Sequence, residues 1–476
     1  MKIKIVTKTA KKEIEIRDDA TDTLLELLQK NGIYVDAPCG GKGTCGRCKV
    51  WMNDVEVLAC QTMPVADCTL RIPKEQEIAA LGAKAEQKAD GQTFGLAVDI
   101  GTTTLAMALI SLATGDVVAT TTSVNHQRSY GADVISRIQA ANEGKGELLR
   151  ACIRDDLMRM KEKLCEGIEG TVVQVVVVGN TTMCHLLLGY SCETLGVAPF
   201  IPVDITLQNV TYGQAEVTIL PGISAFVGAD IVAGIYDCGM AEQGIQTMLL
   251  DIGTNGEMAI GDKHEIVVTS AAAGPVFEGG NISCGMPGVP GAISRVRMTR
   301  NPATEEIVTE YETIGGEPPV GLCGSAVIDV MAGLVRLGLV DENGTLAEPW
   351  FDEGFPVTGE IRFLQEDIRE IQMGKAAIRA GIETLITERG IPEQIYLAGG
   401  FGCYIDEANA ITIGLFPECF AGRIKAIGNG AINGAIRYLG EPRAGEQVER
   451  IADIASELNL AMHTEFNELY VQYMFF

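Results

Sequence analysis

The chain has 476 residues, a formal net charge of −26 and 47% apolar residues. That length allows about two to four domains with cores of their own, and the composition excludes wholesale disorder. The excess of 63 acidic over 37 basic residues disfavours nucleic acid and anionic membrane as partners, because both would repel the chain. The sequence contains no long apolar run, and its first residues alternate apolar and basic. We therefore expect neither a transmembrane helix nor a signal peptide, and a cytoplasmic location.

The first 75 residues are predicted to form one small domain. Alternating apolar segments around Ile3 and Ile14 lie on either side of a lysine-rich turn, which predicts a β-hairpin. Capping residues at 18–21 precede a leucine-rich run that stops at Gly32, so a helix is expected to cross that hairpin. Further strands are predicted over 49–52, 55–59 and 68–72. This order of elements predicts a β-grasp fold of the α+β class.

Four of the 14 cysteines, Cys39, Cys45, Cys48 and Cys60, fall in one short segment after the predicted helix. Their spacing, C-x5-C-x2-C-x11-C, points in a cytosolic chain to metal rather than to disulfides. Four thiolates hold either zinc or an iron–sulfur cluster. The glycines between the first three cysteines favour a 2Fe–2S cluster, because the backbone must wrap tightly and aim N–H groups at sulfide. Zinc and a purely structural role are the alternatives.

Beyond residue 75 the composition changes twice. Residues 76–93 are rich in Ala, Glu, Lys and Gln without a strand pattern, which predicts a linker. From residue 94 onward, buried strands alternate with amphipathic helices, which predicts an α/β fold in two lobes. We expect lobe I over 94–235, lobe II over 236–455 and a C-terminal tail over 456–476.

One short motif occurs once in each expected lobe. Asp99-Ile100-Gly101-Thr102 and Asp251-Ile252-Gly253-Thr254 both follow an apolar strand and precede a second strand that runs back. Glycine lets the backbone approach a phosphate, and successive N–H groups with Thr hydroxyls bind its oxygens. The aspartate at each strand end is expected to hold Mg²⁺ through water, since magnesium dehydrates reluctantly. Two ordinary tight turns are the alternative. The residues assigned to phosphate binding are Gly101, Thr102, Thr103, Thr104, Gly253, Thr254, Asn255 and Gly256.

A third glycine-rich turn, at Gly399, Gly400 and Phe401, follows another apolar strand. Together the three turns resemble the phosphate-1, phosphate-2 and adenosine motifs of the superfamily of acetate and sugar kinases, heat-shock chaperones and actin. The resemblance spans 94–440 and implies a two-lobed, ribonuclease-H-like ATPase of the α/β class that binds MgATP. Lys375, on the helix before the third turn, is either a nucleotide contact or a solvated helix charge.

Polar residues that directly follow buried strands are further candidates, because the resemblance places catalytic groups there. Asn180 follows the strand predicted at 172–178, and Asp230 follows a short apolar run. We assign catalytic roles to Asp99, Asp251, Asn180 and Asp230. A plain helix cap is the alternative for Asp230.

The cysteine loop from Pro38 to Cys48 resembles ferredoxins of the plant and adrenodoxin type. It is one residue longer than the plant spacing, and its short gap to Cys60 is similar to the ferredoxin domains of large oxidoreductases. This resemblance implies one-electron transfer at low potential, since plant-type centres lie near about −400 mV.

A ferredoxin domain ahead of this kind of ATPase closely resembles the reductive activators of corrinoid proteins, a family of iron–sulfur ATPases. The resemblance extends to segments 125–137, 177–183, 271–279 and 473–476. It implies that ATP helps to deliver one electron from the cluster to an inactive Co(II) corrinoid protein, restoring the Co(I) state that methyl transfer needs. It also implies a low-potential electron donor upstream and a homodimer. Larger members carry an additional domain where this chain has only the linker 76–93.

Two other classes of function fit parts of the pattern. A small-molecule kinase with an accessory cluster would need a general base near a substrate hydroxyl, for which Asp230 and Asp133 are candidates without a decisive pattern. A redox sensor would couple the state of the cluster to nucleotide binding without catalysis. A methyltransferase and a corrinoid protein encoded nearby would favour the activator.

Overall fold

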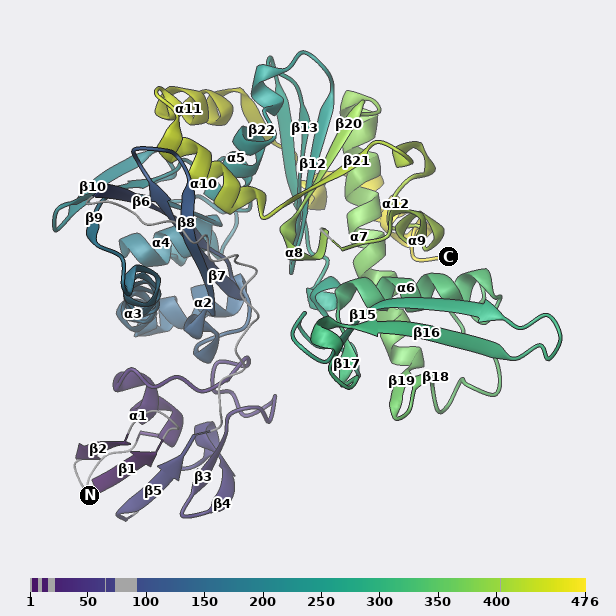
Figure 1. Cartoon of the computed structure of the whole chain (residues 1–476), viewed down its shortest axis with the longest axis horizontal. Helices are drawn as coiled ribbons and strands as arrows, with labels where there is room; N and C mark the ends of the chain where they lie inside the picture. The colour runs from purple at the N-terminus through teal and green to yellow at the C-terminus, as the bar shows by residue number, and fades with distance from the viewer. Residues whose placement is uncertain (1, 7–10, 16–21, 65, 73–91, 403) are drawn as a thin grey trace. The chain divides into compact units, whose positions relative to one another are not determined.

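The structure is a computed structural model that describes residues 2–6, 11–15, 22–64, 66–72, 92–402 and 404–476. Contacts divide the chain into two compact units (Figure 1). Unit 1 comprises residues 1–205 and 209–219, and unit 2 comprises residues 206–208 and 220–476. The linker expected at 76–93 lies outside the described residues except for its last two positions, which begin strand β6.

The N-terminal domain of unit 1 is built on a five-stranded sheet with the order β2-β1-β5-β3-β4. Strand β1 pairs antiparallel with β2 and parallel with β5, which is the arrangement of a β-grasp fold. The expected hairpin is confirmed, because Ile3 pairs with Ile14. The strands are β1 (Lys2–Val6), β2 (Lys11–Glu15), β3 (Lys49–Met52), β4 (Val55–Leu58) and β5 (Cys68–Arg71), and the helix is α1 (Leu24–Lys30).

Helix α1 buries its leucines against the sheet, as the sequence pattern predicts. Its cap differs from the expectation, since the N-cap is Thr23 rather than a residue of 18–21, which lie outside the described residues. The Thr23 side chain accepts from the backbone N–H of Glu26, while the Glu26 carboxylate accepts from the N–H of Thr23 at 2.8 Å. This reciprocal capping box satisfies two N–H groups at the start of the helix.

The remainder of unit 1 contains a six-stranded sheet with the order β10-β11-β9-β6-β7-β8. Strands β6, β7 and β8 form an antiparallel meander, and β9 and β11 extend it in parallel. The strands are β6 (Gln92–Ile100), β7 (Thr104–Ser111), β8 (Val117–Val124), β9 (Gly170–Gly179), β10 (Gln208–Tyr212) and β11 (Ala215–Ile219). The helices are α2 (Val134–Ala140), α3 (Gly146–Cys165) and α4 (Thr181–Leu188), preceded by the short turn η2 (His126–Ser129).

Unit 2 repeats this plan with a sheet of order β21-β20-β12-β13-β14-β22. Its meander β12–β14 continues in parallel into β20 and β21. Leu249 of β12 lies beside Gly234 of α5, whereas Met258 of β13 lies beside Gly381 of α7. Since Met258 pairs with Leu250, the neighbour of Leu249, α5 and α7 cover opposite faces of the sheet. The elements are α5 (Ala229–Asp237), β12 (Thr247–Ile252), β13 (Gly256–Gly261), β14 (Ile266–Ala271), α7 (Gln365–Arg389), β20 (Gln394–Ala398), β21 (Ile424–Gly428), α10 (Gly430–Gly440), α11 (Ala444–Ile454) and β22 (Ala455–Glu457).

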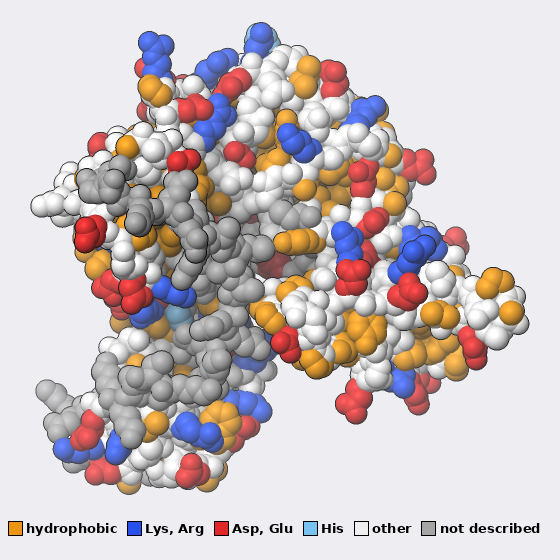
Figure 2. Space-filling view, viewed as in Figure 1, with side chains coloured by type: hydrophobic (Ala, Val, Ile, Leu, Met, Phe, Trp, Pro, Cys, Tyr) orange, Lys and Arg blue, Asp and Glu red, His pale blue; other side chains and the backbone are white. Residues whose placement is uncertain are grey.

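Smaller elements complete unit 2. Figure 2 shows hydrophobic side chains over the sheet formed by β15 and β16, where Val308 and Tyr311 are exposed. Among the described helices, none combines the length and the apolar content needed to span a membrane. The smaller elements of unit 2 are β15 (Ala292–Arg300), β16 (Ile307–Thr313), β17 (Gly321–Leu322), α6 (Gly324–Arg336), β18 (Phe355–Thr358), β19 (Ile361–Phe363), α8 (Gly399–Gly402), α9 (Glu407–Thr412) and α12 (Thr464–Gln472).

Unit 1 ends at residue 219, before the boundary expected between residues 235 and 236. Helix α5 therefore belongs to unit 2. Helix α5 packs closely against α10, where a Cβ on Gly434 would lie 2.1 Å from the carbonyl oxygen of Ala233. Only glycine at 434 allows that approach of two backbones. The apolar pattern of α5 predicts that the helix is buried, but it does not predict the sheet against which the helix packs.

The C-terminal tail expected at 456–476 is part of the core of unit 2. Strand β22 pairs in parallel with β14, and Thr269 donates to the carbonyl oxygen of Leu458 at 2.7 Å. Apolar side chains of the tail, including Phe466 and Phe476, pack against the same core as β12 and α6. Residues 456–476 therefore form no separate segment.

Candidate functional site

The four predicted cluster ligands lie as two pairs of free thiols. The sulfur atoms of Cys39 and Cys45 are 3.3 Å apart. Cys60 lies beside Cys48, and burial followed by the hydrogen bond to Cys48 raises the pKa of Cys60 to about 11. Burial pushes the pKa of Cys39 upward, but hydrogen bonds from Cys45 and Thr44 outweigh it and lower that pKa to about 6. Cys39 therefore becomes a thiolate more readily than Cys60.

The loop that carries these thiols is wrapped by its glycines. Gly40, Gly41, Gly43 and Gly46 all have positive φ angles, between +63° and +91°, which other residues rarely adopt. No three His, Cys, Asp or Glu side chains among the described residues lie close enough to hold a single metal ion. The paired thiols fit a 2Fe–2S cluster, in which each of two irons takes two thiolates.

The first Asp-Ile-Gly-Thr turn lies between β6 and β7 in unit 1. Asp99 is largely buried at the end of β6, and a Cβ on Gly101 would lie 2.5 Å from the carbonyl oxygen of Thr104, so no other residue fits this turn. Asn180 lies at the start of α4 and donates to the Thr102 hydroxyl at 2.9 Å. The structure thus brings Asp99, Gly101, Thr102 and Asn180 together, as expected from their places after strands.

Two polar residues that the assignment omitted hold the same loop. Asn125 donates through its side chain to the carbonyl oxygen of Gly101 and through its backbone to that of Thr103, both at 2.9 Å. Arg137 donates to the carbonyl oxygen of Thr102 at 2.6 Å and is fully buried. In the sequence both residues belong to a polar-rich segment that follows a strand. No motif in that segment indicates that they bond the turn.

The second Asp-Ile-Gly-Thr turn, between β12 and β13 in unit 2, is surrounded by carboxylates. Asp251 of β12 stands opposite Glu257 of β13 in the antiparallel pair. Burial, followed by the charges of Asp230 and Asp251, raises the pKa of Glu257 well above its usual value. Asp230 lies in the first turn of α5 and accepts from the N–H of Ile231 at 3.0 Å. The residues assigned from the sequence include Asp230 and Asp251 but not Glu257. Glu257 is one polar residue of an alternating strand, and nothing in that pattern distinguishes it.

A further acidic residue in unit 2 contacts the turn itself. Glu278 accepts from the Thr254 hydroxyl at 2.8 Å. The turn is tight, because the N–H of Gly253 donates to the carbonyl oxygen of Asn255 at 2.9 Å. Mg²⁺ is usually held by one or two carboxylates together with phosphates, so it does not need a complete protein cage here.

The third glycine-rich turn lies beside the second one, within unit 2. Strand β20 pairs in parallel with β12, which places Ala398 next to Asp251. Gly399 has a φ of +88°, and a Cβ there would lie 2.9 Å from a carboxylate oxygen of Asp251. Gly400 has open space where a side chain would lie. Phe401 belongs to α8, and its side chain lies outside the described part of the chain.

The surroundings of Lys375 differ from both expectations, a nucleotide contact and a solvated helix charge. It is buried, and its ammonium donates to the carbonyl oxygens of Tyr473 at 2.7 Å and Phe475 at 2.5 Å and lies over the ring of Phe476. Burial lowers the pKa of Lys375 to about 7. It is not a solvated helix charge, and its ammonium binds the chain's own tail in the place where a nucleotide was expected.

The fold and these sites define a class: a ferredoxin-type domain joined to a two-lobed ATPase of the acetate kinase, chaperone and actin type. Three family models match, one after another. They are a 2Fe–2S iron–sulfur cluster binding domain at 8–65, the RACo middle region at 94–243 and the C-terminal ASKHA domain of RACo at 246–476.

Individual relatives agree with these models. The corrinoid activation enzyme RamQ of Eubacterium limosum is 32% identical over 419 residues, which cover 79% of this chain and 69% of RamQ. A reductase of the Co(II) methylated-amine-specific corrinoid protein from Methanosarcina barkeri is 28% identical, covering 79% of this chain and 76% of the relative. A solved reductive activator for a corrinoid iron–sulfur protein has a TM-score of 0.73 at 28% identity, covering 99% of this chain and 98% of that one. The chain belongs to the family of reductive activators of corrinoid proteins, and its cofactors are a 2Fe–2S cluster, ATP and Mg²⁺.

Proposed function

We propose that this protein uses ATP to drive one electron from its 2Fe–2S cluster to the inactive Co(II) form of a corrinoid protein. The product is the Co(I) state, which accepts a methyl group in a methyltransferase system. The observation that carries the proposal is the presence in one chain of a paired four-thiol loop and two phosphate-type turns. The names of two relatives, a corrinoid activation enzyme and a Co(II) corrinoid protein reductase, support it.

Cys39, Cys45, Cys48 and Cys60 are proposed as the ligands of the cluster, which when bound takes up and releases one electron. Each 59 mV of uphill one-electron transfer costs a factor of ten in the equilibrium constant. A centre in the usual ferredoxin range, near about −400 mV, therefore reduces a very low-potential cobalt poorly without help. ATP helps only if it favours one state of the complex over another, since a ligand shifts an equilibrium by its difference in affinity.

The two turns have different proposed roles in handling MgATP. In unit 1, the N–H groups and hydroxyls of residues 101–104 bind phosphate, while Asn180 orients the Thr102 hydroxyl. In unit 2, Asp251 and Asp230 hold Mg²⁺ through water, and Gly399 and Gly400 leave room for the nucleotide. Asp99, Asp251, Asn180 and Asp230 are the proposed catalytic set. The contact proposed for Lys375 requires that the tail first release its ammonium.

The partner and the assembly complete the proposal. The net charge of −26 favours a docking partner with a basic face. We further propose a homodimer, an upstream low-potential electron donor and a cytoplasmic location, where cysteines stay reduced.

The decisive experiment is reduction of a purified Co(II) corrinoid protein, followed by absorbance, with and without ATP. The wild-type protein should form Co(I) faster or more completely with ATP. Cys45→Ser should lose both the cluster signal in electron paramagnetic resonance and the activity, whereas Asp251→Ala should keep the signal and lose only the ATP effect. If wild type and Asp251→Ala reduce the corrinoid protein equally with ATP present, ATP hydrolysis has no part in electron delivery. A phosphorylated metabolite without corrinoid reduction would favour a kinase.

A further inference from the structure

The segment from Asn125 to Arg137, here called the bridge segment, holds the first phosphate turn from behind. Its side chains and backbone bond the carbonyl oxygens of Gly101, Thr102 and Thr103, three residues in succession. In a trans peptide the N–H points opposite to the C=O. The N–H groups that follow these carbonyls therefore point away from the bridge segment, which leaves them available to a ligand on the other side of the turn.

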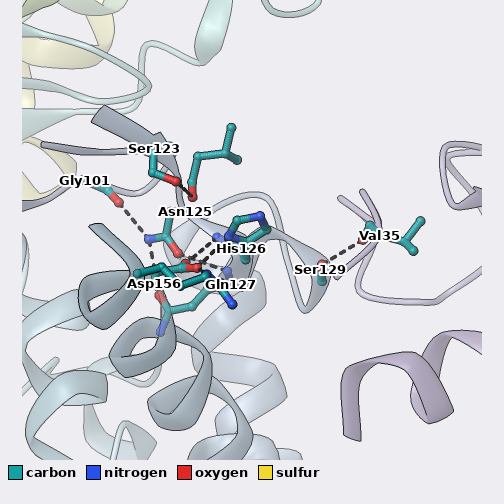
Figure 3. Close-up of polar contacts among 10 residues, drawn as sticks. Val35, Gly101, Ser123, Asn125, His126, Gln127, Ser129 and Asp156 are labelled. Carbon is teal, nitrogen blue, oxygen red and sulfur yellow. Dashed lines mark hydrogen bonds and ion pairs between the residues drawn. The ribbon is translucent and has the colours of Figure 1, made fainter. Parts of the chain in front are cut away.

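The opposite side of the bridge segment contacts the cluster domain within unit 1. Figure 3 shows the Ser129 hydroxyl directed at the carbonyl oxygen of Val35, a bond of 2.7 Å. Gln29 of helix α1 donates to the carbonyl oxygen of Ser129 at 2.6 Å. Arg128 and Asp36 form an ion pair at 2.9 Å that is not aligned as a hydrogen bond. The cluster domain is thus fastened to the same segment that fastens the phosphate turn.

The contact reaches the residues on either side of a cluster ligand. The N–H of Ala132 donates to the carbonyl oxygen of Pro38 at 3.1 Å, directly before Cys39. A Cβ on Gly40, directly after Cys39, would lie 2.7 Å from the carbonyl oxygen of Tyr130. The loop that holds Cys39 therefore lies against the backbone of the bridge segment with no room for a side chain between them.

Burial makes the bridge segment stiff. Asn125, Gln127 and Ser129 are almost fully buried, and the Nδ1 atom of His126 lies 2.6 Å from a carboxylate oxygen of Asp156 on α3 (Figure 3). Gln127 donates to the carbonyl oxygen of Leu149, also on α3, at 2.9 Å. Close-packed interiors transmit displacements rather than absorb them, so a shift at the phosphate turn reaches the cluster loop.

We infer that the bridge segment couples nucleotide binding at residues 101–104 to the docking of the cluster loop at residues 36–46, with Arg137 as the positioning residue between them. The inference rests on the cluster and nucleotide sites of the proposed function. A nucleotide that fixes the turn holds the cluster loop more firmly. By linkage, reduction of the cluster changes nucleotide affinity by the same factor by which nucleotide changes the reduction equilibrium.

The first test measures hydrogen exchange of residues 36–46 in the cluster-loaded protein, with and without Mg²⁺ and a non-hydrolysable ATP analogue. The variants are Asp36→Arg, Arg128→Asp and the double exchange that restores the ion pair with its charges reversed. We expect the analogue to slow exchange of this loop about fivefold in wild type, a typical allosteric coupling. Each single variant should lose that protection, and the double variant should regain it. The exchanged pair Lys49→Glu with Glu56→Lys, on strands β3 and β4, is the matched control and should behave as wild type.

The second test measures the dissociation constant of the analogue with the cluster oxidised and reduced. By linkage, a fivefold difference between the two dissociation constants requires the cluster potential to shift by about 41 mV when the analogue is added. If wild type binds the analogue but shows neither protection of the loop nor a difference between redox states, the inference is wrong and the proposed function stands. If the analogue does not bind at all, the proposed function fails with it.

Discussion

The two Asp-Ile-Gly-Thr turns have the same backbone plan and opposite surroundings. In unit 1 the turn rests on a buried guanidinium and an amide, since Arg137 and Asn125 bond its carbonyl oxygens. In unit 2 the turn lies among carboxylates, where burial and then the charges of Asp230 and Asp251 raise the pKa of Glu257. The repeated motif therefore lies in two different chemical environments.

The difference follows from what each turn has around it. A turn whose carbonyls are already bonded has its N–H groups directed outward before any ligand arrives. A turn among several neighbouring acids carries unfavourable charge that a cation relieves. We therefore expect unit 1 to position phosphate and unit 2 to hold Mg²⁺, and the following variants test that division.

The largest effect is expected for the two strand-end aspartates. Asp99→Ala and Asp251→Ala should each lower ATP turnover by about 10²-fold to 10³-fold, as removal of a preorganised polar group does elsewhere. Only Asp251→Ala should also raise the Mg²⁺ concentration needed for half-maximal phosphate release. The cluster signal should stay unchanged in both. Full ATPase activity in either variant would disprove the role of that aspartate.

Arg137→Met should destabilise unit 1. It removes the donors that satisfy the buried carbonyl oxygens of Thr102 and Gly131, and leaving buried groups unpaired costs about 3 kcal/mol for such a pair. The matched control is Arg154→Met, which replaces an exposed arginine on α3. Thermal unfolding should show a lower first transition for Arg137→Met only. A midpoint equal to that of the control would mean that the turn does not depend on Arg137.

Lys375→Met keeps the length of the side chain and removes the donor to the tail carbonyls of Tyr473 and Phe475. The loss should cost unit 2 about 2 kcal/mol and make the tail accessible to chymotrypsin. ATP affinity should also fall, because the variant cannot make the proposed contact with the nucleotide, and an unchanged affinity would mean that Lys375 serves only the tail. A large loss of affinity together with normal stability would mean that Lys375 serves the nucleotide and not the tail.

Gly399→Ala should lower ATP turnover about tenfold, which corresponds to about 1.4 kcal/mol. The new methyl group would press on the carboxylate of Asp251. Gly422→Ala is the matched control, because Gly422 also has a positive φ, +73°, but open space around it. Both variants carry backbone strain, and only Gly399→Ala should affect the kinetics.

The smallest effect is expected for Glu257→Gln in nucleotide-free protein. An acid whose folded pKa is raised makes the fold less stable as pH rises from its usual pKa through the folded one. Glu257→Gln should therefore raise the melting temperature at pH 8 and leave it unchanged near pH 4. Excess Mg²⁺ should reduce the gain at pH 8, because wild type then has a cation beside the carboxylate. A gain that is equal at both pH values would exclude a charge effect.

Much of the architecture could be predicted from the sequence, because strand alternation, leucine spacing and glycine turns are local signals. The hairpin that pairs Ile3 with Ile14, the strand predicted at 172–178 and the place of Asp99 and Asp251 at strand ends are such cases. What the sequence did not predict depends on packing between distant segments. Arg137 and Glu257 lie on unremarkable elements and acquire their surroundings only from the fold.

The β22 strand has a consequence for the order of folding. Its neighbour Leu458 accepts a hydrogen bond from Thr269, a residue 189 positions earlier in the chain. Domains generally fold as they leave the ribosome, N-terminal parts first. Strand β14 must therefore remain an uncovered sheet edge for most of the synthesis of unit 2, and such edges are templates for aggregation. Heterologous production is expected to improve with slow translation or with a chaperone that shields this edge, whereas the cluster domain is complete early and can acquire its iron while unit 2 is still being made.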